Sequence, residues 1–399
     1  MKPITDEKLI DEVLNRGIEA VYPTKEELKK KLMSGEKIKL YCGFDPTAKS
    51  LHIGNAINIR KLAQFQKLGH EVVFLIGDFT AMIGDPTDKM AARTALSRDE
   101  VLQNCKDYKK QAANLIDFKG KNPAQLKYNS KWLGKLDFAG VLDLASHFTV
   151  QQMVERDMFE KRIEDGKPVY IHEFMYPLMQ GYDSVAMDID LEIGGNDQTF
   201  NMLAGRTLQK VINNKEKFVM TMKLLVDPTG KKMGKTEGNM INLTDTPEDV
   251  FGKVMAWSDQ MIALGFEICT EVPFADIKKM TEEMNEGSNP RDFKIKLAHE
   301  IVRLYKGEKE ADLAQENFIN IFQKKEGPGK VESLKVKSEK LVDVMVEAGL
   351  VDSNSQAKRD IKQGGVKVDE NVINDINAEL DSGEHLIQKG KRHFVRVIV

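Results

Sequence analysis

An uninterrupted apolar run, EVVFLIGDF at residues 71–79, is the feature that most constrains the fold of this chain. It lacks the apolar and polar alternation of a half-exposed strand, which predicts a strand buried on both faces of a parallel sheet. A strand-like run, IKLYCGF at residues 38–44, precedes it, and the segment between them has apolar residues at helical spacing up to Gly69. Strand, helix and buried strand form a βαβ unit. The sequence therefore predicts an α/β fold built on a doubly wound parallel sheet.

The length and composition indicate a chain of several globular domains. Its 399 residues are too many for one typical core and predict two or three domains. Hydrophobic residues make up 41% and charged residues 30%, which is ordinary for a soluble protein, and no run reaches the ~18 apolar residues of a membrane span. The first residues, MKPITDEKLIDEVLNRG, carry acids and no apolar signal core. We therefore expect a cytoplasmic protein with no membrane partner.

The cysteines and the net charge exclude further classes of protein. Cys42, Cys105 and Cys269 are odd in number and far apart, so they predict neither a disulfide framework nor metal-ligand spacing. No bound structural metal is expected. The formal net charge of -3 excludes a bulk basic protein, so any nucleic-acid partner would have to be held by local patches.

The stretch GKKMGKT, residues 230–236, is close to the phosphate-binding P-loop pattern. A P-loop needs four residues between its first Gly and its Gly-Lys pair, so that backbone N–H groups wrap a phosphate. Here only three residues separate Gly230 from Gly234, and Thr229 stands where a P-loop would need Gly. The spacing argues against a P-loop NTPase. That alternative predicts ATP hydrolysis without any amino acid.

The loop after the first predicted strand is the first candidate site, because ligands of parallel α/β sheets bind at strand carboxyl ends beside helix N-termini. Thr47, His52 and Asn55 lie in this loop and helix start and can hydrogen-bond oxygen atoms. Gly54 lets a phosphate approach the backbone closely because it has no Cβ. The structural alternative is that Thr47 and Asn55 cap the helix and that His52 is an ordinary satisfied side chain.

A second strand-end loop, IGDPTDKMAAR at residues 83–93, supplies Asp85, Lys89 and Arg93. Two cations four residues apart can clamp phosphates, although a solvated surface would have the same pattern. Loops at strand ends of this Gly-Asp-Pro type commonly carry binding residues. This loop is therefore the second candidate site.

Two further polar groups lie between residues 170 and 200. Tyr176, Gln180 and Asp183 are spaced by four and three residues, which puts them on one side of a helix. The alternative is a core tyrosine and a solvent-exposed aspartate. The stretch GGNDQ, residues 194–198, places consecutive hydrogen-bonding side chains after two glycines, which suits a backbone that passes close to a ligand. Its Asp197 stands at a strand end, where an aspartate can bind a ribose diol.

HIGN at residues 52–55 and KMGKT at residues 232–236 resemble the two signature motifs of class I aminoacyl-tRNA synthetases, usually written HIGH and KMSKS. The stretches YCGFDPTAKSLHIGN, IGDPT, YPLMQGYDS and GGNDQ narrow the resemblance to tyrosyl-tRNA synthetases of bacterial type. It runs from about Tyr41 through KMGKT and, more faintly, to the C-terminus. The resemblance implies a Rossmann-like catalytic sheet, and it identifies GKKMGKT as a loop that closes over ATP.

The resemblance also implies a pocket for tyrosine. Tyr41 and Asp183 would hydrogen-bond the substrate phenol, one as donor and the other as acceptor. Asp85, Tyr176 and Gln180 match the residues that hold the substrate ammonium group. The whole set assigned to tyrosine is Tyr41, Thr80, Asp85, Tyr176, Gln180, Asp183 and Gln198.

A second set of residues would bind and activate ATP. Asp197 matches the ribose ligand, and Thr47 with His52 matches the pair that grips the transferring triphosphate. The residues assigned to ATP binding are Gly43, Asp45, His52, Gly54, Asn55, Asp197 and Lys235. The residues assigned to catalysis are Thr47, His52, Lys89, Arg93, Lys232, Lys235 and Thr236.

The chain departs from the family motifs at three positions. Asn55 replaces the second His of HIGH, and Gly234 and Thr236 replace the serines of KMSKS. An Asn amide still donates hydrogen bonds and Thr keeps a hydroxyl. We therefore expect altered rates and a working active site.

The implied reaction joins L-tyrosine to ATP, which carries Mg²⁺, to give tyrosyl-adenylate and pyrophosphate, and then moves tyrosine to the 3' end of tRNA(Tyr). The substrate carboxylate is the nucleophile, so no nucleophilic side chain is required. The family also implies a homodimer. Two alternatives are a tryptophanyl-type synthetase and a catalytically inactive RNA-binding relative. The polar pocket pair argues against the first, and retention of the cationic loop residues argues against the second.

The C-terminal part fits an RNA partner. Residues 246–326 have apolar residues at helical spacing, as in DFKIKLAHEIVRLY, and predict an α-helical tRNA- or anticodon-binding domain, with a plain helical spacer as the alternative. Residues 327–399 begin in a linker and resemble a small α+β RNA-binding module shared with a ribosomal protein. Its candidate RNA-binding residues are Lys358, Arg359 and Lys362. Residues 1–245 would then form the catalytic domain.

Overall fold

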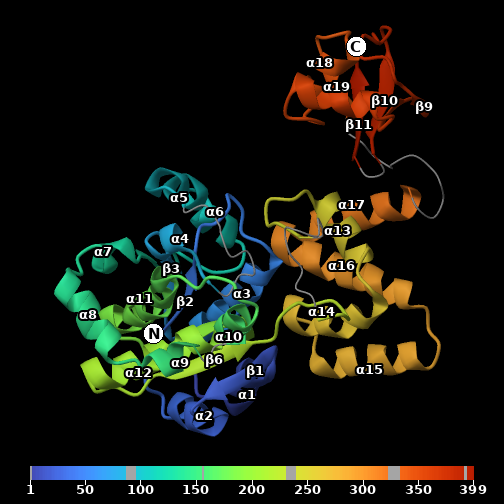
Figure 1. The fold of residues 1–399 in the computed structure, drawn as a ribbon. Helices are drawn as coiled ribbons and strands as arrows, with labels where there is room; N and C mark the ends of the chain where they lie inside the picture. Colours follow the sequence, from blue (N-terminus) through green and yellow to red (C-terminus); the bar gives the residue numbers. More distant parts are fainter. Residues whose placement is uncertain (1, 87–95, 155–156, 231–239, 322–332, 391–392) are drawn as a thin grey trace. The chain divides into compact units, whose positions relative to one another are not determined.

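The computed structural model describes residues 2–86, 96–154, 157–230, 240–321, 333–390 and 393–399 (Figure 1). The chain divides into two compact units. The first contains Met1–Asp245 and Trp257–Phe293, and the second contains Thr246–Ala256 and Lys294–Val399. The predicted division into functional domains at residues 245 and 326 stays a prediction, because compact structural units need not coincide with the segments that carry separate functions.

The first unit is built on a six-stranded sheet in the order β1-β6-β5-β2-β3-β4. All neighbours pair in parallel except β1, which is an antiparallel edge strand on β6. Strand order runs outward from β2 in both directions, which is the doubly wound arrangement, so the predicted α/β fold is confirmed. The strands are β1 (Ile18–Tyr22), β2 (Lys39–Phe44), β3 (Glu71–Ile76), β4 (Gln125–Tyr128), β5 (Leu191–Gly195) and β6 (Phe218–Met222).

Helices complete the first unit. Helices α11 and α12 pack closely together, because Gly181 on α11 leaves room for the backbone at Gly205 on α12. Its helices are α1 (Glu7–Asn15), α2 (Lys25–Met33), α3 (Ile53–Lys67), α4 (Thr80–Ile83), α5 (Arg98–Cys105), α6 (Tyr108–Ala112), α7 (Ser130–Leu133), α8 (Phe138–Ser146), α9 (Val150–Val154), α10 (Asp157–Glu164), α11 (Ile171–Met187), α12 (Thr199–Asn213), α14 (Ile262–Cys269) and α15 (Phe274–Asn285), with the 3₁₀ turns η1 (Asn196–Gln198) and η3 (Asp259–Met261).

The second unit contains helices and a small α+β domain. Helix α13 packs on α17, where the Phe251 and Phe318 rings lie 5.2 Å apart. Its C-terminal sheet has the order β7-β11-β10-β8-β9 and shares one apolar core with α18 and α19. The elements are α13 (Pro247–Met255), α16 (Pro290–Lys306), α17 (Glu308–Ile319), β7 (Ser333–Lys335), α18 (Leu341–Glu347), α19 (Asn354–Lys362), β8 (Val366–Val368), β9 (Asn371–Val372), β10 (Glu384–Lys389) and β11 (His393–Ile398).

None of the helices in the part of the chain that the structure describes has the length and apolar character needed to cross a membrane.

Three buried cations connect α1, α3 and α14. Arg16 donates to the Val272 carbonyl at 2.7 Å, and Arg60 of α3 donates to the Thr270 carbonyl at 2.6 Å. Both carbonyls follow the C-terminus of α14, where the helix dipole favours positive charge. Lys61 lies beside them and donates to the Val13 carbonyl of α1. Burial, together with the charges of Arg60 and Arg16, lowers the pKa of Lys61 to about 7.

This lowered pKa predicts that the contribution of Lys61 to the free energy of unfolding of the first unit increases as pH rises. The unfolded lysine keeps its proton up to a pKa of ~10.4, so between pH 7 and pH 10 the unfolded chain binds more protons than the folded chain. The free energy of unfolding of wild type, relative to Lys61→Met, should increase by up to about 1.4 kcal/mol per pH unit across that window.

Urea unfolding of both proteins at pH 6, 7, 8 and 9 measures this difference. Lys67→Met is the matched control, because the Lys67 side chain is 74% exposed and should give no such slope. A constant difference between wild type and Lys61→Met from pH 7 to 9 would contradict the prediction.

Candidate functional site

The candidate site lies at the carboxyl ends of β2, β3 and β5. These strands are parallel neighbours, so the residues that follow them meet at one edge of the sheet. Asp45 follows β2, Thr80 begins α4 after β3, and Asp197 lies in η1 after β5. From β2 the chain first adds β3 and β4 on one side of the sheet and then β5 and β6 on the other. Doubly wound sheets bind ligands at the point of this reversal, which here lies between β2 and β5.

The Asp45 carboxylate joins two residues of the predicted tyrosine set. Thr80 Oγ1 donates to Asp45 Oδ1 at 2.7 Å, and the Tyr176 hydroxyl donates to Asp45 Oδ2 at 2.8 Å. Burial, and then the charges of Asp45 and Asp85, raise the pKa of Tyr176, so its hydroxyl stays protonated as a donor. A Cβ at Gly77 would lie 1.9 Å from Asp45 Oδ1, so the close approach of this carboxylate to the backbone just after β3 requires glycine there.

Asp183 is buried and is held by two side chains that the sequence analysis missed. Trp132 Nε1 donates to Asp183 Oδ1 at 2.7 Å, and Asn129 Nδ2 donates to Oδ2 at 3.2 Å. Burial raises the pKa of Asp183, and these two donors act in the opposite direction. Asn129 also donates to Thr80 Oγ1 at 3.1 Å, which links Asp183 to the Asp45 network.

Tyr41, in the central strand β2, is fully buried. Its hydroxyl lies 3.1 Å from Ser184 Oγ and 3.4 Å from the Gln180 carbonyl oxygen on α11. Burial, followed by the charges of Glu192 and Asp183, raises the pKa of Tyr41. Trp132 packs against the apolar cluster that contains the Tyr41 ring, so one tryptophan supports both members of the predicted phenol-binding pair.

Asp85 and Gln198, predicted from separate motifs, lie side by side. Gln198 Nε2 donates to Asp85 Oδ2 at 2.6 Å, and Asn201 Nδ2 donates to Gln198 Oε1 at 2.9 Å. Gly195 fits the neighbouring Asp197, because a Cβ at that position would lie 2.5 Å from Asp197 Oδ1. Gln198 of GGNDQ therefore lies against Asp85 of the second strand-end loop.

His52 and Asn55 cap helix α3 reciprocally. The Asn55 backbone N–H donates to His52 Nδ1 at 3.4 Å, and the His52 backbone N–H donates to Asn55 Oδ1 at 3.0 Å. Asn55 therefore caps the helix, and its assigned role in ATP binding stays a prediction. A ring that accepts at Nδ1 carries its proton on Nε2, which makes Nε2–H a donor of the kind a phosphate oxygen needs. A Cβ at Gly54 would lie 3.0 Å from two atoms of the His52 ring, so glycine gives that ring its room.

Backbone pairing connects the flanks of the two signature motifs. The Ile53 N–H donates to the Ile241 carbonyl at 2.9 Å, and the Leu243 N–H donates to the Leu51 carbonyl at 2.8 Å. His52 pairs antiparallel with Asn242 between them. Residues close behind KMGKT therefore lie against HIGN. Lys89, Arg93, Lys232, Lys235 and Thr236, with Gly234, lie outside the described residues.

The remaining predicted residues fall in two places. Gly43 is exposed near the end of β2, and the Thr47 N–H donates to the Asp45 carbonyl at 2.8 Å, so both lie beside the Asp45 network. The candidate RNA-binding residues Lys358, Arg359 and Lys362 are exposed on α19 in the second unit.

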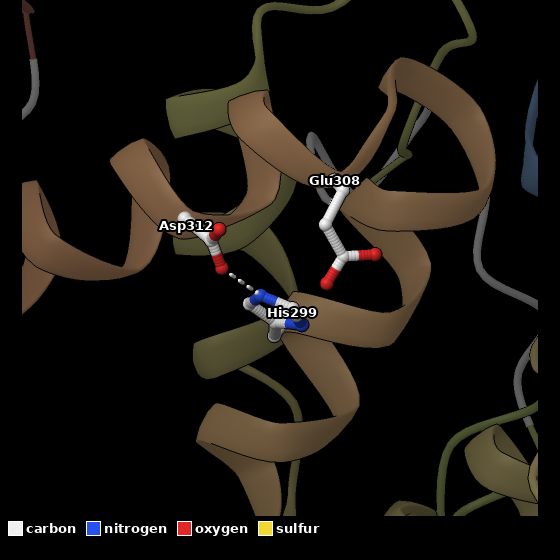
Figure 2. A group of neighbouring side chains, drawn as sticks. All are labelled: His299, Glu308 and Asp312. Carbon is white, nitrogen blue, oxygen red and sulfur yellow. Dashed lines mark hydrogen bonds and ion pairs between the residues drawn. The ribbon is translucent and has the colours of Figure 1, made fainter.

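A group of metal-ligating residue types lies in the second unit. His299 on α16 faces Glu308 and Asp312 on α17, and their ligand atoms lie within 4.8 Å of one another (Figure 2). His299 Nε2 is 2.8 Å from Asp312 Oδ1, and Arg303 Nε is 3.9 Å from Glu308 Oε2. The His299–Asp312 hydrogen bond and the Arg303–Glu308 ion pair hold these side chains together.

Family models match nearly the whole chain. A model described as tRNA synthetases class I (W and Y) matches residues 33–323, and a model of the tyrosine–tRNA ligase SYY-like C-terminal domain matches residues 323–397. The chain is 45% identical over 388 residues to a tyrosine–tRNA ligase of Haemophilus ducreyi, covering 97% of each chain. It is 44% identical over 413 residues to that of Carboxydothermus hydrogenoformans, covering 99% of each.

Solved structures resemble the fold. The C-terminally truncated mitochondrial tyrosyl-tRNA synthetase of Coccidioides posadasii superposes with a TM-score of 0.63 at 26% identity, over 77% of this chain and 90% of that one. The corresponding Aspergillus nidulans protein has a TM-score of 0.67 at 24% identity, over 79% and 94%.

Proposed function

Because this chain belongs to the tyrosine–tRNA ligase family of class I tRNA synthetases, we propose that it activates L-tyrosine with ATP and transfers it to tRNA(Tyr). The observation that carries the proposal is the cluster of buried polar side chains beside β2, in which Tyr41 and Asp183 lie among hydrogen-bonded partners. A buried carboxylate and a buried phenol suit a ligand with a hydroxyl of its own. Tryptophan offers an N–H and no hydroxyl, and phenylalanine offers neither.

Tyrosine selection follows from the same pair. Asp183 accepts from Trp132 and Asn129, and each carboxylate oxygen keeps a lone pair for a substrate phenol O–H. Phenylalanine in the pocket would leave these buried polar groups without a substrate partner. The free-energy cost of leaving them unpaired is much larger than the loss of van der Waals contact from one missing oxygen atom. The ammonium group of the substrate would lie among Asp85, Tyr176 and Gln180.

Activation joins the tyrosine carboxylate to the α-phosphate of ATP, which enters with Mg²⁺ on its phosphates. Pyrophosphate leaves as tyrosyl-adenylate forms. Chemistry of this kind is accelerated mainly by positioning and by charge placed where the transition state needs it. His52 Nε2–H and Thr47 would grip the triphosphate, and Asp197 would hold the ribose. The assigned roles of Gly43, Asp45, Gly54 and Asn55 in ATP binding, and of Lys89, Arg93, Lys232, Lys235 and Thr236 in catalysis, belong to this proposal.

Transfer requires a tRNA partner. We propose that residues 1–245 form the catalytic domain, that residues 246–326 contact tRNA, and that residues 327–399 bind RNA through α19. A match to a C-terminal domain model at residues 323–397 supports the last boundary. The reaction serves protein synthesis, so we propose a cytoplasmic location, which cell fractionation would test.

We also propose a homodimer, supported by exposed apolar side chains on three helices of the first unit. Phe138 of α8 is 77% exposed, Val150 of α9 is 72% exposed and Ile171 of α11 is 78% exposed. Helices α8 and α11 pack together through Leu144 and Val185. Contiguous exposed apolar patches mark association surfaces, and we propose that these side chains belong to one.

ATP–pyrophosphate exchange with each amino acid supplied singly tests the proposed function. Exchange should occur with tyrosine and be absent with phenylalanine. Exchange driven by tryptophan would indicate the tryptophanyl alternative, and exchange with no amino acid, despite folded protein, would indicate an inactive RNA-binding relative.

Sedimentation equilibrium tests the homodimer. The wild-type mass should be about twice the 45.1 kDa of one chain. Ile171→Asp should shift the mass to that of one chain, because a carboxylate would be buried in the interface. Leu102→Asp is the matched control, since Leu102 is exposed on α5. Wild type sedimenting as a single chain would contradict the proposal.

Charge reversal on α19 tests RNA binding. The triple variant Lys358→Glu, Arg359→Glu and Lys362→Glu should reduce aminoacylation of tRNA(Tyr) at least about tenfold at physiological salt, because lost phosphate contacts weaken binding. Tyrosine-dependent exchange should not change. The control reverses Lys335, Lys337 and Lys340, which are exposed in the same domain. Equal losses in both variants, or none in the α19 variant, would contradict a contact through α19.

A further inference from the structure

A buried ion pair lies beside residues assigned to the proposed tyrosine site, and neither of its members was predicted to belong to that site. Lys217, directly before β6, is 0% exposed, and Glu192 on β5 is 1% exposed. Lys217 Nζ forms an ion pair with Glu192 Oε2 and donates to Ser184 Oγ at 2.8 Å and to the Met202 carbonyl at 3.1 Å. Three acceptors for three ammonium protons satisfy this lysine completely.

The pair is sealed by helix α12. A Cβ at Gly205 would lie 2.5 Å from Lys217 Nζ and 3.0 Å from Ser184 Oγ, so no side chain fits there. Burial lowers the pKa of Lys217, and the neighbouring Glu192 charge opposes that shift. Buried ion pairs are often replaced by apolar residues without loss of stability, so stability alone does not explain this one.

Both oxygens of Glu192 act on residues of the pocket. Oε1 accepts from Gln180 Nε2 at 3.0 Å, and Oε2 accepts from Ser184 Oγ at 3.3 Å. Ser184 is in turn 3.1 Å from the Tyr41 hydroxyl. The ion pair therefore reaches both ends of the proposed tyrosine site, the ammonium end through Gln180 and the phenol end through Ser184.

The contact with Glu192 determines the orientation of the Gln180 side-chain amide. A carboxylate accepts and cannot donate, so the Gln180 amide must turn its NH₂ toward Glu192. The opposite orientation would place the amide oxygen against a carboxylate oxygen. The carbonyl end of the amide is therefore the end left for a ligand, and a substrate ammonium group needs an acceptor.

We propose that Glu192, held in place by Lys217, is a positioning residue that fixes the Gln180 amide with its oxygen toward the ammonium group of the amino-acid substrate. This inference rests on the proposed function and assigns a role to two residues that touch no substrate. A purely structural pair would affect every ligand of the pocket equally. A positioning pair affects ligands that carry an ammonium group.

The test compares two charge-neutral double variants that keep the side-chain volume similar. Glu192→Met with Lys217→Met removes the acceptor for Gln180. Glu192→Gln with Lys217→Met keeps an acceptor oxygen at position 192 and is the matched control. Circular dichroism and thermal unfolding establish that both variants fold.

Two non-reactive ligands separate the roles by equilibrium binding. Tyramine carries the phenol and the ammonium, and 3-(4-hydroxyphenyl)propionate carries the phenol without the ammonium. Tyramine should bind the Met/Met variant ~10 to 100-fold more weakly than wild type, the range expected for a hydrogen bond to a charged group. The propionate should bind both proteins within about threefold, and the Gln/Met variant should recover most of the tyramine affinity.

Equal weakening for both ligands would overturn the positioning role, as would unchanged tyramine binding in the Met/Met variant. The proposed function is judged separately in wild type. If wild type binds neither tyrosine nor either analogue, the proposed function fails. If wild type binds all three and the variants show no difference between the ligands, only the positioning role fails.

Discussion

The parallel hydrogen bonding of β2 with β3 on one side and β5 on the other determines where the site residues of the first unit lie. Three strands that run in one direction end at one edge, and the side chains after them converge there. The Asp45 carboxylate then connects α4 and α11 through Thr80 and Tyr176, positions separated by nearly a hundred residues in the sequence. Reversal of β2 alone would carry Asp45 to the opposite edge and dissolve this network.

Local pattern was sufficient to predict the main fold. The apolar run at residues 71–79 predicted a strand buried on both faces. The helical pattern between this run and the strand at residues 38–44 predicted the βαβ unit. The antiparallel edge strand β1 was missed, because its partner β6 lies about two hundred residues away and no pattern within Ile18–Tyr22 reports that pairing. Its residues are only partly buried, so they carry a weaker apolar signal than a central strand.

The assigned ligand-binding roles stay predictions, but the structure shows which side chains hold the assigned residues in place, and the sequence analysis missed those. The spacing of Tyr176, Gln180 and Asp183 correctly placed them on α11, but the exposed alternative for Asp183 is wrong, because it is 2% exposed. Its donors Trp132 and Asn129 come from the segment after β4, and only tertiary contact selects them. Lys217 was missed for a related reason, since an isolated lysine in a sequence is ordinarily a surface residue.

The anchoring of helix α3 has a mechanical consequence for the proposed nucleotide site. It begins at the His52 cap and is 15 residues long, which makes it a rod of about 22 Å. Further along the same rod, Arg60 is bound to the carbonyls of Ile268 and Thr270. If helix α3 tilted so that His52 moved, these buried hydrogen bonds would have to break or α14 would have to move together with α3. The HIGN end of helix α3 is therefore held in a fixed position relative to α14, so under the proposed function any rearrangement around bound substrates would involve other segments of the site.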